Sequence, residues 1–242
     1  MKKPIQANKP KKLILLDIDG TLISWVGKQV HGLARFQHGM KIAWGIEVGD
    51  EIGKFEGVPE WKSAWEVVKL YGISRPKYEK NFPVYVEAMH AFLDMHGKIV
   101  PLYGQIPDAM NLVADLHNQA HVHLGVLSAN AERTGRWKLQ HCNLHEFFSF
   151  GLWGDNAETR VEIAQKVFHK AQKFFRQNFL SRDIVVVGDT IHDIQCGKAI
   201  GAVTIAVKTG GHTREQLYEK RPDLLVDSLM DERVLSLLGL KK

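Results

Sequence analysis

The sequence predicts an α/β fold with a parallel sheet, and three observations support this prediction. Short apolar runs, each long enough for one buried strand, alternate with segments of helical periodicity. Three of these runs end directly in polar side chains, and they occupy residues 13–16, 123–127 and 184–187. The carboxyl ends of parallel strands lie at one edge of a sheet, where ligands bind in open α/β folds. The polar side chains are therefore expected to meet at that edge.

The first run, Leu-Ile-Leu-Leu, stops where two carboxylates follow, Asp17 and Asp19. Unpaired charges are costly to bury, so the strand must end at this point. One residue separates the two aspartates, which places both side chains on the same face of an extended segment. They can therefore share one ligand or one metal ion. Gly20 and Thr21 then allow the chain a sharp exit.

The other two runs repeat this pattern. A β-branched run ends just before Asp189 and Asp193, and the run between the two acidic pairs ends in Ser128 and Asn130. An isolated Asp-x-Asp is usually a solvated turn. Three strands that each end in polar groups indicate one shared site instead.

The remaining elements alternate in the order expected of βαβ units. Helical spacing of apolar residues predicts helices at 108–119, 131–140, 158–177, 192–200, 213–219 and 231–238. Further strands are predicted at 203–207 and, as an edge strand, at 224–226. Gly201 is placed to end the helix before it in a left-handed cap.

The segment between Trp25 and Tyr103 differs, because it contains no clear alternating run. Its patterns are helical, at 31–45, 59–71 and 77–95. Hinges are expected near residues 23–27 and 100–104. The segment carries four tryptophans, for which packing in a small helical bundle is favoured over an aromatic wall that selects a substrate: Trp25, Trp44, Trp61 and Trp65.

Composition excludes several classes of protein. The chain has 242 residues, ordinary globular composition and no apolar stretch long enough to span a bilayer, so no membrane association is expected. Two cysteines make no disulfide framework, which predicts a reducing cytoplasm. Cys196 is interpreted as a small buried hydrophobe rather than a reactive thiol.

The net charge of +5 belongs to the first twelve residues, which contain five lysines and no acid. Removing those five from the 32 basic residues leaves 27, equal to the 27 acidic residues. Residues 1–12 are therefore predicted to be a basic, disordered tail without a function of its own. No aromatic-basic recognition motif is present, so no nucleic-acid partner is expected.

Three motifs together resemble one family. Asp-Ile-Asp-Gly-Thr-Leu from Asp17, Leu-Ser-Ala-Asn ending at Asn130, and Gly-Asp-Thr-Ile-His-Asp-Ile from Gly188 are similar to those of the haloacid dehalogenase-like (HAD) hydrolases, and most similar to the phosphoglycolate phosphatase-like branch. The stretch from Thr209 to Glu215 adds to the likeness. The resemblance implies a Rossmann-like, three-layer core at 13–23 and 104–242, with a small helical cap inserted at 24–103. A hinged cap can exclude water from a site and contact the substrate.

The resemblance also implies roles for the motif residues. Asp17 is the expected nucleophile, which forms an aspartyl-phosphate. Asp19 is the expected general acid for the leaving oxygen and base for the incoming water. The hydroxyl of Ser128 and the N–H groups of Ala129 and Asn130 are expected to bind the phosphoryl group, with Gly20 and Thr21 also at the substrate. Asn130 either orients Asp19 or caps its helix, and capping is slightly favoured.

A metal and a cation complete the expected site. Mg²⁺ would offset the repulsion between aspartates and phosphate, held by the carboxylates of Asp17 and Asp189, the carbonyl of Asp19, and Asp193 directly or through water. If Asp189 caps the next helix, Asp193 lies one turn along it. The phosphate-neutralising cation is expected to be Arg160, with Lys166 as the alternative.

These residues predict a Mg²⁺-dependent phosphatase acting on a small phosphorylated metabolite, either phosphoglycolate-like or a sugar phosphate. The segment 56–60 departs from the specificity loop of phosphoglycolate phosphatases. Three alternatives stay open: a phosphomutase; a phosphonate hydrolase, which would need Lys54 or Lys62 as a Schiff-base lysine; and a non-catalytic binding protein on the same fold.

Overall fold

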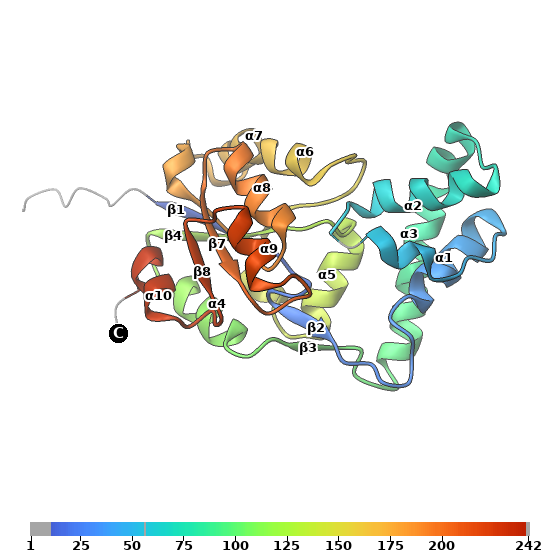
Figure 1. The fold of residues 1–242 in the computed structure, drawn as a ribbon, viewed down its shortest axis with the longest axis horizontal. Helices are drawn as coiled ribbons and strands as arrows, with labels where there is room; N and C mark the ends of the chain where they lie inside the picture. Colours follow the sequence, from blue (N-terminus) through green and yellow to red (C-terminus); the bar gives the residue numbers. More distant parts are fainter. Residues whose placement is uncertain (1–10, 56, 241–242) are drawn as a thin grey trace, which may run out of the picture.

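The computed structural model describes residues 11–55 and 57–240. Six parallel strands form the main sheet in the order β5-β4-β1-β6-β7-β8 (Figure 1). Their bounds are β1 (Lys12–Leu16), β4 (Val122–Leu127), β5 (Phe150–Leu152), β6 (Ile184–Gly188), β7 (Val203–Val207) and β8 (Leu224–Val226). The order places β1 between β4 and β6, so the polar side chains that follow these three strands meet at one edge.

Strand β1 is buried on both faces. Leu13 and Leu15 belong to the hydrophobic cluster on one side of the sheet, while Ile14 and Leu16 belong to the cluster on the other. All four side chains are fully buried. This burial explains why the run is continuously apolar and does not alternate. Continuous apolar runs are typical of central strands in parallel sheets.

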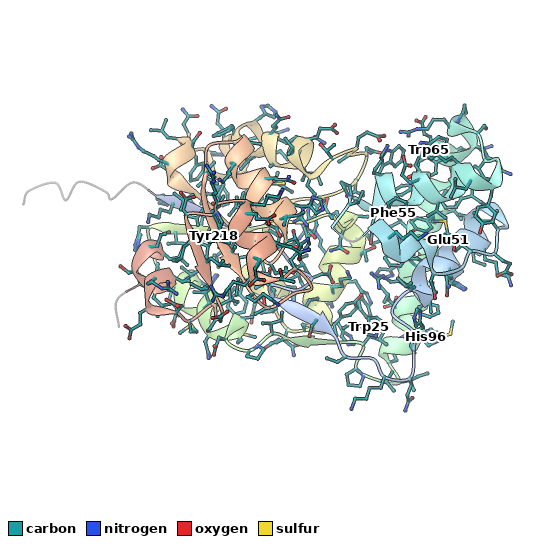
Figure 2. The ribbon with its side chains drawn as sticks, in the orientation of Figure 1. Trp25, Glu51, Phe55, Trp65, His96 and Tyr218 are labelled. Atoms are coloured by element: carbon teal, nitrogen blue, oxygen red, sulfur yellow. The ribbon has the colours of Figure 1, made fainter. Side chains whose placement is uncertain are left out.

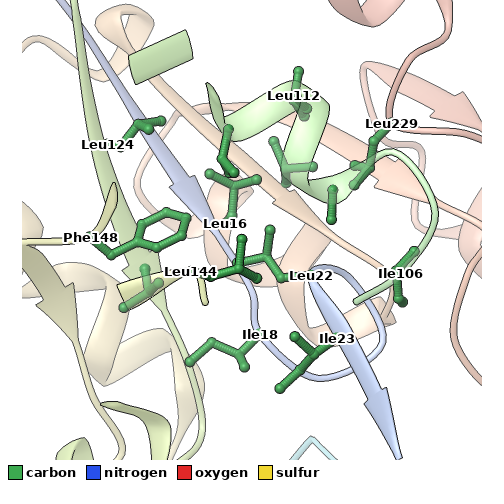
Figure 3. Packing of buried hydrophobic residues seen from close by; sticks show 14 of the residues in the cluster. Leu16, Ile18, Leu22, Ile23, Ile106, Leu112, Leu124, Leu144, Phe148 and Leu229 are labelled. Atoms are coloured by element: carbon green, nitrogen blue, oxygen red, sulfur yellow. The ribbon is translucent and has the colours of Figure 1, made fainter. Parts of the chain in front are cut away.

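Helices cover both faces of the sheet and give three layers. Apolar side chains of α4 (Ala109–His117), α5 (Glu132–His141) and α10 (Glu232–Leu238) pack on one face. Those of α6 (Arg160–Gln165), α7 (Val167–Phe175) and α8 (Ile191–Ala199) pack on the other. Helix α9 (Arg214–Glu219) contacts α8. Figure 3 shows the first face, where Leu16, Leu22, Leu112 and Phe148 belong to one hydrophobic cluster.

The segment between the first two strands of the main sheet forms a separate helical part with its own core. It contains α1 (Ala34–Trp44), α2 (Glu60–Val68) and α3 (Arg75–Gly97), and α5 lies between it and the sheet (Figure 1). Trp44 and Trp61 are buried in this core, and Trp65 packs against it. Phe55 and Trp65 lie in this part and Tyr218 lies on the sheet part (Figure 2). The preferred interpretation of the tryptophans is confirmed for these three.

Two short strands connect the parts. β2 (Ile23–Trp25) and β3 (Tyr103–Gln105) pair antiparallel at the positions where hinges were expected. Three residues are too few to show alternation in a sequence, so neither strand was predicted. Trp25 belongs to β2 and not to the helical bundle, so its assignment to the bundle was wrong. The α/β class with a helical insertion is confirmed, while the boundaries at 13–23, 24–103 and 104–242 stay a prediction.

Other local differences have simple causes. The predicted helix 158–177 is two helices that divide at Lys166, because apolar spacing continues across the break. The strand β5 was also too short to predict. Strand β1 begins at Lys12, inside the predicted tail, and residues 1–10 of that tail lie outside the described residues. Four 3₁₀ turns complete the described elements: η1 (Asp50–Phe55), η2 (Lys69–Tyr71), η3 (His145–Phe147) and η4 (Ser181–Asp183).

Within residues 11–55 and 57–240, no helix is both long and apolar enough to cross a bilayer. Cys142 and Cys196 are buried, free thiols, so the interpretation of Cys196 as a buried hydrophobe is confirmed.

Candidate active site

A cavity of about 550 Å³ opens where β1, β4 and β6 end. Asp17, Ser128 and Asp189 line it, one from the end of each strand, and residues of the helical part line it as well. The three polar strand ends predicted from the sequence therefore share one space. The cavity lies between the sheet and the inserted helices, so any molecule bound there contacts both.

Three carboxylates cluster at the edge of the sheet. Asp17, Asp189 and Asp193 are buried, and each offers an oxygen within 4.8 Å of the others. Burial raises the pKa of Asp17 to about 7, with Arg160 opposing the shift and Asp193 adding to it. Burial, Asp193 and Asp17 together raise the pKa of Asp189 to about 8. The three carboxylates carry more negative charge than the single arginine beside them can neutralise, as expected of a site for a cation.

Arg160 is the cation within this cluster. The N-cap Thr159 starts helix α6, and Arg160 follows it as the first helical residue. The guanidinium Nη2 lies 3.2 Å from Oδ1 of Asp17 and also contacts Asp193. Its Nε is buried and has no hydrogen-bond partner among the described residues. Lys166, the alternative, is exposed at the end of α6.

Asp193 is fixed by the start of helix α8. Thr190, and not Asp189, is the N-cap of that helix, so the condition under which Asp189 would cap it is not met. Oδ2 of Asp193 accepts hydrogen bonds from the N–H (3.0 Å) and the hydroxyl (2.6 Å) of Thr190, and Oδ1 accepts from Arg160. Both carboxylate oxygens of Asp193 therefore already have partners.

Asp189 sits in a pocket made by glycines. Oδ1 accepts a hydrogen bond from the hydroxyl of Thr21 at 2.8 Å. A Cβ on Gly210 would lie 1.7 Å from Oδ2 of Asp189, and a Cβ on Gly20 would lie 2.3 Å from it. Gly20 also has a φ of +81°, a conformation that few other residues adopt. Thr21 is fully buried behind Asp189, outside the cavity lining, which corrects its expected place at the substrate.

Asp19 is held by two residues that follow β4. Asn130 Nδ2 donates to Oδ2 of Asp19 at 2.7 Å, and Lys138 Nζ lies 2.9 and 2.7 Å from its two oxygens. Burial alone would raise the pKa of Asp19, but Lys138 and Asn130 outweigh it and the pKa lies below its ordinary value. Ala131 is the N-cap of α5, so the slight preference for Asn130 as a cap was wrong.

Lys138 was missed from the sequence. It lies on α5, is 1% exposed, and donates to Oδ1 of Asn130 at 2.7 Å as well as to Asp19. A lysine on a helix is usually solvated, and nothing in its neighbours distinguishes this one. Its place in the site is seen only in the structure, where it is buried against Asp19, 119 positions away in the sequence.

Ser128 and its neighbours form the loop after β4. The Ser128 hydroxyl accepts hydrogen bonds from the N–H of Asn130 (3.3 Å) and from Asn130 Nδ2 (2.8 Å). The carbonyl of Ala129 accepts from the N–H of Glu60, a residue of the helical part, at 2.9 Å. Ser128, Ala129 and Asn130 all line the cavity. The loop therefore lines the cavity and also contacts the inserted helices.

A second group of contacts ties the helical part to the core. Glu158, just before α6, accepts hydrogen bonds from Trp61 Nε1 at 3.3 Å and Arg75 Nη2 at 2.9 Å. Lys62 forms an ion pair with it at 3.1 Å. These three donors come from α2 and α3 and attach the helical part to the core.

Comparisons with known proteins agree with this geometry. A family model described as HAD-hydrolase-like matches residues 154–231. The chain is 25% identical over 135 residues to a phosphoglycolate phosphatase of Synechococcus elongatus, a match that covers 56% of this chain and 60% of that relative. It is 19% identical over 228 residues to a phosphoglycolate phosphatase of Thiobacillus denitrificans, covering 93% and 96% of the two chains.

The fold agrees with that of a solved relative over nearly the whole chain. CbbY from Rhodobacter sphaeroides, solved in complex with phosphate, superposes with a TM-score of 0.69 at 17% identity and covers 95% of this chain and 100% of its own. At this identity the likeness shows the shared fold. The partial family match and the two phosphatases, at 19–25% identity, show that the chain is similar to HAD-like hydrolases and, among them, to phosphoglycolate phosphatases.

Proposed function

We propose that this HAD-family phosphatase hydrolyses a small phosphorylated metabolite with Mg²⁺, through an aspartyl-phosphate on Asp17. One observation carries the proposal: Asp17 is buried beside Arg160 and two further carboxylates, and it still lines an open cavity. A carboxylate in an unreactive core would be enclosed on all sides. Here it faces a space that can admit a phosphate ester.

The proposed chemistry has two displacements. An oxygen of Asp17 attacks phosphorus, the ester P–O bond breaks, and the leaving alcohol takes a proton from Asp19. Water then attacks the aspartyl-phosphate, Asp19 takes its proton, and inorganic phosphate leaves with Asp17 restored. Lys138 and Asn130 favour the ionised form of Asp19, which is the form that the second step needs. For the first step Asp19 must take up a proton from solvent, which the negative charge of a bound phosphate ester beside it favours.

Two groups are placed to bind the phosphoryl oxygens. Arg160 neutralises charge beside Asp17. The hydroxyl of Ser128 lies at the end of β4 and lines the same cavity. Donors fixed in advance in a water-poor site stabilise the charge that develops on a transferring phosphoryl group.

The carboxylate cluster has the donors that Mg²⁺ prefers, because it offers buried oxygens close together and no nitrogen or sulfur ligand. Asp17 and Asp189 would hold the ion directly, with the carbonyl of Asp19. Asp193 would act through water, since both of its oxygens are occupied by Thr190 and Arg160. Bound Mg²⁺ supplies positive charge that offsets the repulsion between these carboxylates and the phosphate.

The site disfavours one alternative. A phosphonate hydrolase needs a Schiff-base lysine, but Lys54 is exposed and Lys62 is paired with Glu66 and Glu158. Neither lines the cavity. A phosphomutase and a binding protein remain as outcomes of the test. The buried free thiols are in keeping with a cytoplasmic location, which is part of this proposal.

Phosphate release from a generic aryl phosphate tests the function. We would measure it with Mg²⁺, with EDTA, and for Asp17→Asn, which keeps the shape of the side chain. Release that needs Mg²⁺ and is lost in the variant is expected. A folded protein that releases no phosphate from this compound or from a panel of metabolite phosphates would contradict the proposal.

A further inference from the structure

Three polar side chains in the cavity wall are not used by the proposed chemistry. They are Arg35 from α1 and Glu60 from α2 in the helical part, and Tyr103 from the connecting strand β3. Each is buried, and each has a polar atom without a hydrogen-bond partner among the described residues. Buried polar groups are normally paired, so unpaired ones at a cavity indicate a partner supplied by a ligand.

Arg35 is a buried cation that makes no close ion pair, although the charges of Asp19 and Glu60 act on it from a distance. Its Nη1 donates to the carbonyl of Gly32 at 2.9 Å, and the guanidinium stacks over Phe36 at 4.0 Å. Its Nε is unpaired, and no carboxylate of the described residues forms an ion pair with it within 4.0 Å. A buried charge is costly unless it is paired. An anionic oxygen on the ligand would offset this cost.

Glu60 presents one oxygen to the protein and leaves the other free. Oε2 accepts a hydrogen bond from the N–H of Ala131 at 2.8 Å, which fixes the carboxylate against the loop after β4. Oε1 is buried and unpaired in the described part of the chain. Burial raises the pKa of Glu60, which reflects the cost of keeping the carboxylate from water. A hydroxyl or ammonium donor on the ligand would reduce that cost.

Tyr103 lies beside the expected acid and base group. Its ring is 5.1 Å from Nζ of Lys138, and its hydroxyl has no partner among the residues described. Burial raises the pKa of this phenol, so it stays neutral and able to donate. It can therefore bind an acceptor on the leaving group close to Asp19.

From these three groups we propose that the leaving alcohol carries both a carboxylate and a hydrogen-bond donor, with Arg35 binding the carboxylate and Glu60 the donor. The charges of Arg35 and Glu60 cancel, and Asp19 neutralises Lys138. This part of the cavity wall therefore fits a leaving alcohol that is either a zwitterion or a hydroxy acid. The ligand class is a short phosphorylated amino acid or phosphorylated polyhydroxy acid. Glycolate has the carboxylate and lacks the donor.

This inference rests on the proposed function, and a substrate panel separates the two. The panel contains phosphoserine and 3-phosphoglycerate, which have a carboxylate and a donor. It also contains phosphoglycolate, with a carboxylate only, glycerol 3-phosphate, with donors only, and an aryl phosphate, with neither. The value of kcat/KM is expected to be highest for phosphoserine or 3-phosphoglycerate, by at least about tenfold, the size of one hydrogen bond to a charged group. The better of the two identifies the donor as ammonium or hydroxyl.

Two variants test which group of the substrate Arg35 and Glu60 each bind. Arg35→Met should lower kcat/KM about tenfold more on the carboxylated compounds than on the aryl phosphate. Glu60→Gln keeps an oxygen for the Ala131 N–H but turns a donor toward the cavity. It should lower the preference for donor-bearing compounds over phosphoglycolate by a similar factor. Arg214→Met and Glu66→Gln, at exposed and half-buried ion pairs away from the cavity lining, are matched controls that should change neither ratio.

The outcomes are distinct. Turnover of the aryl phosphate with no preference among the metabolites overturns this inference and leaves the proposed function in place. Preference without sensitivity to Arg35 or Glu60 overturns the assignment of the wall. No turnover of any compound overturns both. Because the wild-type panel alone tests the preference, a variant that fails to fold does not remove the test.

Discussion

The buried ammonium group of Lys138 lies 2.7 Å from Oδ2 of Asp19, whose own side chain is 44% exposed. The lysine is thus held inside the protein while the aspartate reaches the cavity. An ordinary surface pair would have both charges in water and would contribute little. This pair instead fixes the direction of a carboxylate that exchanges protons with the ligand in the proposed mechanism.

Replacing Lys138 with methionine should lower kcat about 100-fold, the lower end of what a positioned acid and base contributes. The variant keeps the apolar stem and removes three contacts of the ammonium group, two to Asp19 and one to Asn130. Steady-state kinetics on the aryl phosphate measures the change. Lys170→Met, an exposed lysine on α7, is the control. A kcat within twofold of wild type would show that Asp19 does not need Lys138.

Removing Arg160 should destabilise the protein in EDTA. Breaking a buried ion pair by deleting one partner costs about 3–5 kcal/mol, because the remaining charges lose their compensation. Here Asp17 and Asp193 would both remain. Urea unfolding of Arg160→Met measures the loss, and Arg160→Lys, which keeps the charge, should lose less. Equal losses for the two variants would show that packing rather than charge is responsible.

Gly210→Ala tests the pocket around Asp189. Its Cβ would lie 1.7 Å from Oδ2, so the carboxylate must move. We expect Mg²⁺ affinity, measured by calorimetric titration, to fall at least about tenfold, since metal sites tolerate little displacement of a ligand. Gly49→Ala is the matched control, because its Cβ would meet only the end of the Glu51 side chain. Unchanged affinity in Gly210→Ala would argue against Asp189 as a ligand.

Glu158→Ala should weaken the interaction between the helical part and the core. The carboxylate has partners on α2 and α3, and exposed pairs contribute about 0.2–1 kcal/mol each. KM is therefore expected to rise severalfold, and the difference from wild type should shrink at high salt. Asp227→Ala, which breaks an exposed ion pair with Arg214 away from the helical part, is the control. A salt-independent rise in KM would point to another cause.

The central strands and the acidic cluster were predictable because each depends on neighbours in sequence. A continuous apolar run such as residues 13–16 must be buried, and the charge after it must lie at the strand end. Arg160 was found from its place near a helix start. The strands β2, β3 and β5 were not predicted, because three residues show no period.

The wall of the cavity could not be predicted for a different reason. Arg35, Glu60 and Lys138 look in the sequence like ordinary charged helix residues, which are usually solvated. Their burial depends on how α1, α2 and α5 meet over the end of the sheet. Asn130 illustrates the same limit, since its side chain could cap a helix or reach Asp19, and only the tertiary contact decides.

The central position of β1 has a consequence for how the protein gains activity. Asp17, Ser128 and Asp189 follow three adjacent strands that are far apart along the chain, so no short segment contains a working site. Non-local pairing of this kind is slow to form, because long loops must close first. During refolding from denaturant, helix content should return before catalysis does. Recovered turnover would then report completion of the sheet, and truncated forms of the chain should be inactive even where they are folded.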